Sequence, residues 1–355
     1  MERMKLYETL VNLPGIAGNE GMVRSFVKKE LEKHTSDIIQ DNLGSIFGVD
    51  RGQGPTIMIA GHMDEVGLMV VGINEDGFIK MLPIGGIQAE VYYSQNMEVI
   101  VSSTKRIKGL IGAIPPHINR GHDDEVKKLN FDDLLLDIGA SSKQEALDWG
   151  IAIGQQIVSQ NNYYVMEDGQ KIVSKAWDNR FGVGMALEVF AEASKIAHPN
   201  TLICGATVQE EVGLRGATTA SNLVKPDLFI AVDVSPVGDF LPKDHPRAFG
   251  KLGEGFLIRF YDPRCVMHQG IRGYFEKLAK QNNIKYQYFL SMGGTDAAAA
   301  QYSGAIATTV GLPGRYIHTN AAIIDVRDVE EVKKMLLALI VNFDEQALQE
   351  VKDHV

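Results

Sequence analysis

Apolar residues recur at helical and at strand-like spacings along the chain, and the change between the two predicts the elements. The first 50 residues predict helix, loop, helix, with short apolar strands at 45–49 and 56–60. Beyond residue 175 the pattern alternates between strands (202–208, 228–234, 306–310) and helices (185–193, 274–281, and one long amphipathic helix at 329–351). This alternation predicts an α/β fold with a mainly parallel central sheet flanked by helices.

The pattern changes between residues 68 and 164. Short β-like runs separated by Gly, Asn and Asp turn residues lie at 68–73, 78–81, 97–101 and 156–159. A small all-β domain at 68–164 is therefore predicted to interrupt a discontinuous domain made of residues 1–67 and 165–355.

Charge, hydrophobicity and cysteine content limit the classes of partner and the cellular compartment that the sequence predicts. A net charge of -10 argues against nucleic acid or an anionic membrane as the main partner. The chain has neither a run of ~20 apolar residues that would span a membrane nor the pattern of a signal peptide. Cys204 and Cys265 are not spaced as a disulfide framework. These features predict a cytoplasmic protein.

Five side chains of the kind that binds metal ions stand where predicted strands or helices meet loops. They are His62, Asp178, Glu211, Asp233 and His318. In open α/β sheets, functional sites gather beyond the carboxyl ends of the strands. Alone, Asp178 could be a helix N-cap and His318 a structural histidine. Together the five predict a metal site.

Two further carboxylates accompany these residues. Asp64 follows His62 by two positions, so both side chains lie on one face of an extended strand. Asp64 can then accept a hydrogen bond from one imidazole nitrogen while the other binds metal. Glu210 and Glu211 close a buried strand, where uncompensated carboxylates are costly. One of the pair can bind metal while the other activates water.

The number of candidate ligands favours two ions. Two histidines and three carboxylates exceed what one tetrahedral zinc needs, whereas a carboxylate shared between two ions uses them all. Two ions about 3.5–4 Å apart can bind one water and polarise a carbonyl together. The remaining glutamate then serves as general base, with a pKa raised by burial. The sequence contains no HExxH, GxSxG, Walker or GxGxxG motif that would indicate another chemistry.

Several short motifs occur in order along nearly the whole chain. They are GHMDEVG at 61–67, DNR at 178–180, QEEVG at 209–213, Asp233, GGTDA at 293–297 and RYIH at 315–318. Their combination resembles the tetrahedral aminopeptidases, which include the bacterial glutamyl aminopeptidases. The resemblance implies a catalytic α/β domain interrupted by a barrel-like dimerisation domain, zinc or cobalt as the metal, and a homo-oligomer built from dimers, up to a dodecamer.

The resemblance also implies roles for individual residues. Asp178 would bridge the two ions. One site would be completed by His62 and Asp233, and the other by Glu211 and His318. The catalytic residues would be Glu210, as the proton acceptor, and Asp64, which would orient His62.

The predicted function is an aminopeptidase that releases N-terminal residues from short peptides. The resemblance to glutamyl aminopeptidases suggests acidic N-terminal residues, and Arg259, Arg264 or Arg315 could pair with them. Taken singly, each of these arginines is more simply interpreted as a surface or structural residue. Three alternatives stay open: a broad-specificity or leucyl-type aminopeptidase, another amide hydrolase such as a deacylase or carboxypeptidase, and a non-catalytic binding subunit.

Overall fold

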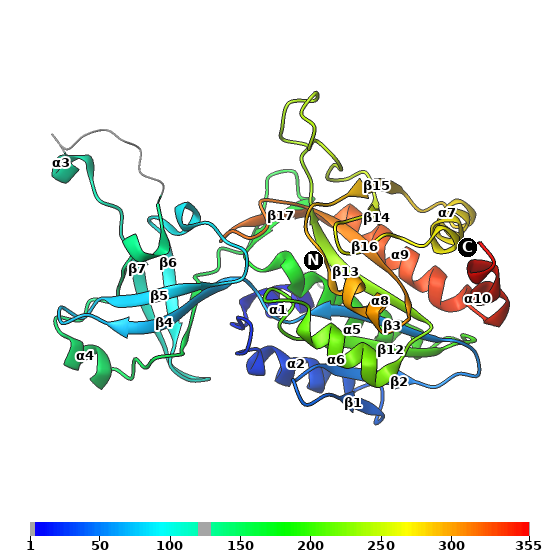
Figure 1. Cartoon of the computed structure of the whole chain (residues 1–355), viewed down its shortest axis with the longest axis horizontal. Coiled ribbons are helices and arrows are strands. Elements are labelled where there is room, and N and C mark those ends of the chain that lie inside the picture. Colours follow the sequence, from blue (N-terminus) through cyan, green and yellow to red (C-terminus); the bar gives the residue numbers. More distant parts are fainter. Residues whose placement is uncertain (1–3, 120–128, 355) are drawn as a thin grey trace.

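The structure, a computed structural model, describes residues 4–119 and 129–354 (Figure 1). It consists of a large sheet covered by helices and of a closed β-barrel beside it. Within the described residues the large sheet has 11 strands. These are β1 (Ile38–Gln40), β2 (Ile46–Asp50), β3 (Thr56–His62), β10 (Tyr164–Val165), β11 (Lys171–Ser174), β12 (Thr201–Thr207), β13 (Leu228–Pro236), β14 (Phe256–Tyr261), β15 (Tyr286–Leu290), β16 (Ile306–Arg315) and β17 (Ala322–Asp325).

The centre of the large sheet is parallel. Its strand order is β1-β2-β12-β3-β13-β16-β17-β11-β10, with β14 beside β16 and β15 beside β14. Strand β3 pairs in parallel with β12 and β13, and β13 with β16. The predicted parallel centre is confirmed, and antiparallel pairs at both edges make the whole sheet mixed. Consequently the carboxyl ends of β12, β3, β13 and β16 lie along one edge of the sheet.

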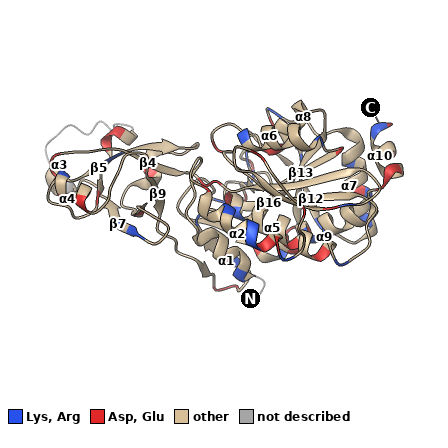
Figure 2. Ribbon diagram, turned by 90° about the horizontal axis from the view of Figure 1, so that it is seen from below, with Lys and Arg blue, Asp and Glu red and all other residues tan. Residues whose placement is uncertain are grey.

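Helices cover both faces of this sheet, as its buried residues require. Ile57 and Ile59 of β3 pack into the larger core, and Met58 and Ala60 pack into a second core on the opposite face. The helices of the larger core are α1 (Met4–Asn12), α2 (Gly21–Leu31), α5 (Trp177–Ala193), α7 (Gln269–Gln281), α9 (Val326–Asn342) and α10 (Glu345–Lys352). The second core is covered by α6 (Arg215–Val224) and α8 (Asp296–Tyr302). Strands β3 and β12, in the centre of this sheet, contain no Lys, Arg, Asp or Glu. Many of the charged residues lie on the surrounding helices (Figure 2).

The barrel is built entirely from the middle of the chain. Its strands close in the order β4-β5-β8-β7-β6-β9 around a separate hydrophobic core. They are β4 (Gly67–Ile73), β5 (Ile79–Ile84), β6 (Asn96–Ile100), β7 (Arg106–Ile111), β8 (Leu136–Asp137) and β9 (Gln156–Ser159), and the short helices are η1 (Ala89–Tyr92), α3 (Pro116–Asn119), η2 (Phe131–Asp133) and α4 (Lys143–Asp148). The barrel-like architecture expected for this stretch is confirmed, whereas the division at residues 68 and 164 stays a prediction.

The predicted long helix at 329–351 is wrong, because two helices occupy that stretch. Helix α9 ends at Asn342, and Asp344 caps α10 by accepting a 2.8 Å hydrogen bond from Ala347 N. The side-chain amide of Asn200 donates to the carbonyls of Ile340 and Phe343 at 2.6 and 3.1 Å. These carbonyls at the end of α9 are thereby satisfied without a further helical turn.

Replacing Asp344 with alanine is expected to lower the free energy of unfolding by about 1 kcal/mol, the usual cost of losing an N-cap. Urea unfolding followed by circular dichroism measures this. Asp353→Ala at the other end of α10 is the control. Among the described residues, its carboxylate accepts a hydrogen bond only from the exposed Gln349 side chain. Equal destabilisation by the two variants would contradict the capping role.

None of the helices among the described residues has the length and apolar character needed to cross a membrane.

Candidate active site

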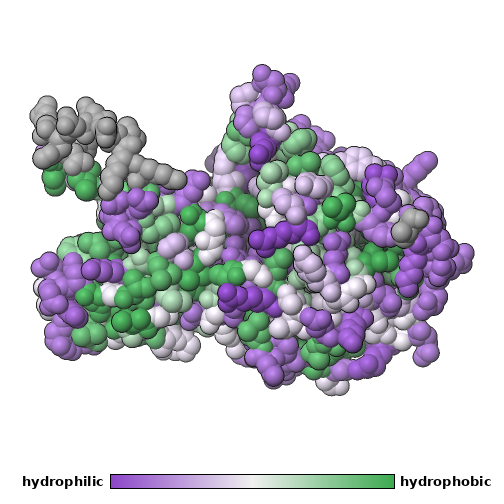
Figure 3. Space-filling view, viewed as in Figure 1, coloured by the Kyte–Doolittle hydropathy of each residue, from purple (hydrophilic) through white to green (hydrophobic). Residues whose placement is uncertain are grey.

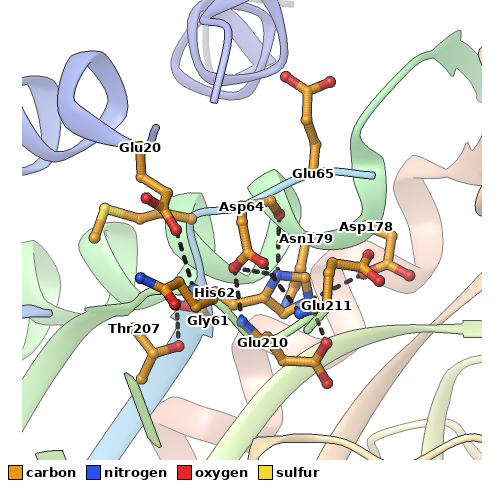
Figure 4. A network of polar contacts seen from close by, with 12 residues as sticks. Glu20, Gly61, His62, Asp64, Glu65, Asp178, Asn179, Thr207, Glu210 and Glu211 are labelled. Carbon is orange, nitrogen blue, oxygen red and sulfur yellow. Dashed lines mark hydrogen bonds and ion pairs between the residues drawn. The ribbon is translucent and has the colours of Figure 1, made fainter. Parts of the chain in front are cut away.

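The predicted metal-binding side chains converge at the carboxyl edge of the parallel strands. Figure 4 shows His62, Asp178 and Glu211 among them. His62 is the last residue of β3, and Asp233 lies in the second half of β13. Glu211 follows β12, and Asp178 stands at the start of α5. Strand β16 continues to Arg315, beyond the predicted end at residue 310, so His318 comes soon after it. All five therefore reach one place from separate parts of the chain.

Asp178 lies between the two histidines. Its Oδ1 is 3.2 Å from His62 Nε2, and its Oδ2 is 3.3 Å from His318 Nε2. Each oxygen thus faces one imidazole, which is the arrangement a carboxylate needs to join two ion sites. The helix-cap alternative for Asp178 is not what the structure shows, since the side chain of the next residue, Asn179, accepts from Gly182 N at 2.9 Å.

The remaining carboxylates complete two groups around His62. Asp233 Oδ1 and Glu210 Oε2 lie 3.9 and 4.0 Å from His62 Nε2. Glu211 Oε1 lies 3.5 Å from His318 Nε2. Ligand atoms of His62, Glu210 and Asp233 lie within 4.8 Å of one another, as do those of His62, Asp178 and Glu211. Distance alone therefore allows Glu210 to be a ligand as well as a base.

Asp64 contacts both His62 and the glutamate pair. Its Oδ1 is 3.5 Å from His62 Nδ1, and its backbone carbonyl is nearer, at 3.0 Å. Its carboxylate oxygens accept hydrogen bonds from the backbone N–H groups of Glu210 and Glu211, both at 3.0 Å. Asp64 thus holds the backbone of the glutamate pair beside His62, a contact that sequence spacing did not reveal.

A buried ion network lies behind Asp64. Glu65 pairs with Lys175 and, at 3.2 Å, with Arg180, and all three side chains are buried. Arg180 also donates to the carbonyls of Met63, Leu10, Leu13 and Gly15. The network fastens the start of α5 to the segment that follows β3. Sequence reasoning missed it, because adjacent charged residues such as Asp64 and Glu65 carry no sign of which one is buried in an ion pair.

The carboxylates crowd one another electrostatically. Burial raises the pKa of Glu211 to about 7, an effect opposed by His318 and reinforced by Asp178. Burial likewise raises the pKa values of Glu210 and Asp233 well above their usual range. Burial lowers the pKa of His318, but its hydrogen bond to Asp178 and the charge of Glu211 outweigh this and bring it to about 10. The site therefore gathers more carboxyl groups than its two histidines can neutralise when all are ionised, and burial disfavours the ionised forms of Glu210, Glu211 and Asp233.

This donor set fits divalent metal ions. Imidazole nitrogens and carboxylate oxygens are ligands of zinc and related metals. Glu211 Oε1 is buried and, apart from the 3.5 Å approach of His318 Nε2, has no hydrogen-bond partner among the described residues, which is costly for a carboxylate. Cations held among these groups would satisfy that oxygen and balance the excess negative charge.

A cleft of about 640 Å³ opens over the site. Its lining includes the five predicted ligands and Glu210, but not Asp64, together with Arg259 and Arg264. Arg259 is buried and engaged, donating to the Gly293 carbonyl and lying 3.2 Å from Asp262. Arg264 is exposed, and within the described parts of the chain no ion pair of its side chain is found.

Arg315, the third arginine considered as a substrate contact, does not line the cleft. It forms a two-pronged ion pair with Asp239, with both hydrogen bonds at 2.7 Å. This pair connects the end of β16 to the loop after β13. The structural interpretation therefore fits Arg315.

Comparison with known proteins gives a consistent result. A family profile described as M42 glutamyl aminopeptidase matches residues 44–335. A glutamyl aminopeptidase of Lactococcus lactis subsp. cremoris is 35% identical over 359 residues, covering 100% of both chains. A lysyl aminopeptidase of Pyrococcus furiosus is 30% identical, covering 95% of this chain and 96% of its own.

Solved structures share the whole fold. The TET aminopeptidase of the marine sediment archaeon Thaumarchaeota archaeon SCGC AB-539-E09 superimposes with a TM-score of 0.92 at 32% identity, covering 99% of this chain and 100% of that one. The Pyrococcus horikoshii TET1 peptidase, described as assembling into a tetrahedron or a large octahedral shell, gives a TM-score of 0.87 at 28% identity, covering 96% and 100%.

Proposed function

The chain belongs to the M42 family of glutamyl aminopeptidases, and we propose that it releases N-terminal residues from short peptides at a centre of two divalent metal ions. Family membership makes the chain a peptide hydrolase. The observation that carries the two-ion proposal is the position of Asp178, one oxygen of which faces His62 and the other His318.

In this proposal Asp178 is the shared ligand. His62 and Asp233 complete one site, and Glu211 and His318 complete the other. The buried Glu211 Oε1 without a hydrogen bond supports the second site, and the 3.9 Å distance from Asp233 Oδ1 to His62 Nε2 supports the first. Zinc or cobalt suits this mixture of imidazole and carboxylate.

Glu210 acts as the base in this proposal. When bound, the two ions lower the pKa of a water molecule and polarise the first peptide carbonyl. Glu210 accepts the proton of that water and passes it to the leaving amine as the C–N bond breaks. The backbone N–H of Glu210 donates a hydrogen bond to Asp64, and Glu210 itself lines the cleft. The carboxylate of Glu210 is therefore free to face the substrate.

Two substrates that differ only at the N-terminus test the function. The purified chain, loaded with Zn²⁺ or Co²⁺, is expected to hydrolyse a short peptide with a free N-terminus and to leave its N-acetylated form intact. A deacylase would remove the acetyl group, and a carboxypeptidase would cleave both peptides. A chain that binds no divalent ion would support the non-catalytic alternative.

We further propose that the residue removed is acidic. Arg264 supports this, because it is the arginine of the cleft whose charge is not already paired among the described residues, whereas Arg259 is held by Asp262. An arginine and a carboxylate pair through charge-assisted hydrogen bonds. A panel of N-terminal residues tests the preference, and cleavage of Leu or Ala far faster than Glu or Asp would contradict it.

Replacing Arg264 with alanine is expected to lower kcat/KM for N-terminal glutamate by about 10–100-fold, the loss that follows from removing a hydrogen bond to a charged group. For N-terminal alanine, kcat/KM is expected to stay within about threefold. Arg272→Ala is the control, because this exposed arginine pairs with Glu276 and does not line the cleft. An equal decrease in kcat/KM for both substrates would show that Arg264 does not determine the preference for an acidic residue.

The chain is also proposed to form a homo-oligomer through its barrel, based on dimers and reaching a dodecamer. Large hydrophobic side chains of the barrel are exposed, among them Val71, Leu82 and Leu110, and a hydrophobic area covers part of the barrel in Figure 3. Such areas mark protein interfaces. A monomeric mass in light scattering would contradict this proposal.

A further inference from the structure

The turn that follows strand β5 of the barrel touches the candidate metal centre. The backbone carbonyl of Gly86 lies 2.7 Å from His318 Nδ1. Since a carbonyl can only accept a hydrogen bond, Nδ1 is the donor, and Nε2 is the nitrogen that faces Asp178 and Glu211. The hydrogen bond from the barrel thus determines that His318 presents Nε2 to the candidate metal centre.

The preceding residue, Gly85, packs against the other ligand of the same site. Gly85 has a φ of +90°, and a Cβ added to it would lie 3.3 Å from both Cβ and Oε2 of Glu211 and 2.8 Å from Val66 Cγ1. Glycine is therefore required by the backbone conformation and by the space next to Glu211.

A third contact secures the loop that carries His318. The side-chain amide of Asn320 donates to the side chain of Gln95, which lies in the barrel between η1 and β6. Within the described parts of the chain, no such hydrogen bond is found for the two ligands proposed for the other site alone. His62 Nδ1 meets the carbonyl of Asp64, and Asp233 Oδ1 accepts from Val234 N. Among the described residues, these contacts with the barrel therefore involve the proposed site of Glu211 and His318 and not the site of His62 and Asp233.

We infer that the Gly85–Gly86 turn of the barrel is a positioning element of the site formed by Glu211 and His318. The inserted barrel then has a role in metal binding that is separate from subunit contact. The inference rests on the proposed two-metal function. Groups that orient metal ligands typically change metal affinity by about 10–100-fold when they are altered.

Gly85→Ala tests this, with Gly154→Ala as the matched control. Gly154 also lies in the barrel and has a φ of +88°, but a Cβ there would meet nothing within 4 Å. Full-length chains are stripped with a chelator and dialysed against buffered Zn²⁺, and the bound zinc is counted by atomic emission. Gly85→Ala is expected to keep one zinc at normal affinity and to bind the second about 10–100-fold more weakly, whereas Gly154→Ala binds both normally.

Melting temperatures separate folding from metal binding. The melting temperature of the metal-free variant, compared with that of the unmodified chain, measures how much the substitution destabilises the fold. The rise in melting temperature on adding Zn²⁺ measures metal binding, because a ligand that binds only the folded state stabilises it. If Gly85→Ala does not fold, Gln95→Ala replaces it without backbone strain and is expected to weaken the same single zinc.

Two outcomes overturn the inference alone: both zinc ions bind to the variant as they do to Gly154→Ala, or both weaken equally. Failure of the unmodified chain to bind any Zn²⁺ would instead overturn the proposed function together with this inference.

Discussion

Replacing Glu210 with glutamine is expected to lower kcat by about 10²–10⁴-fold, the usual contribution of a positioned general base, while both metal ions stay bound. Glutamine keeps the shape of the side chain but cannot accept the proton of the attacking water. The carboxylate of Glu210 lines the cleft, and its backbone is fixed by Asp64, so the substitution should leave the backbone in place. Steady-state kinetics and zinc content of the same preparation provide the two readouts.

The zinc content of this variant decides between two roles that distance alone allows. Glu210 Oε2 is as close to His62 Nε2 as Asp233 Oδ1 is, at 4.0 against 3.9 Å. Loss of a zinc ion in Glu210→Gln would make Glu210 a ligand. Near-normal turnover with both ions bound would remove it from the mechanism. Glu254→Gln, which changes an exposed glutamate paired with Lys251, controls for the loss of one charge.

The sequence predicted that the five candidate metal-binding residues come together because each stands at or near the end of an element. His62 and Asp233 lie on parallel strands whose carboxyl ends are forced to one edge of the sheet, so local patterns implied a shared location. The position of a residue at the end of an element does not indicate which side chains it contacts. Whether Asp178 capped a helix or faced two histidines depends on long-range packing, and His318 became a candidate only in the company of the others.

Backbone contacts were beyond sequence reasoning. The hydrogen bonds from Glu210 and Glu211 N–H to Asp64 join residues 146 and 147 positions apart, and the Gly86 carbonyl that meets His318 belongs to no side-chain pattern. The division between α9 and α10 was missed for a related reason. Buried apolar residues continue on both sides of Asp344, so periodicity alone joined two helices that a cap separates.

Asp178 is the residue on which the proposed two-ion arrangement depends most. Its two oxygens lie 3.2 and 3.3 Å from the two imidazoles. Burial by itself raises its pKa, but hydrogen bonds from His318 and His62 bring the pKa below its usual range. Its negative charge is therefore present across the working pH range. A bridging ligand needs that charge, because it contributes to the affinity of both ions.

Replacing Asp178 with asparagine is accordingly expected to abolish binding of both ions at Zn²⁺ concentrations that saturate the unmodified chain, and to lower kcat/KM by more than about 10⁴-fold, since metal activation of water is lost. Zinc content after dialysis and peptide hydrolysis measure the two effects. Asp168→Asn, which changes an exposed carboxylate paired with Lys171, should alter neither. If Asp178→Asn instead keeps one zinc at full affinity, the carboxylate serves a single ion, and the two sites are independent of each other.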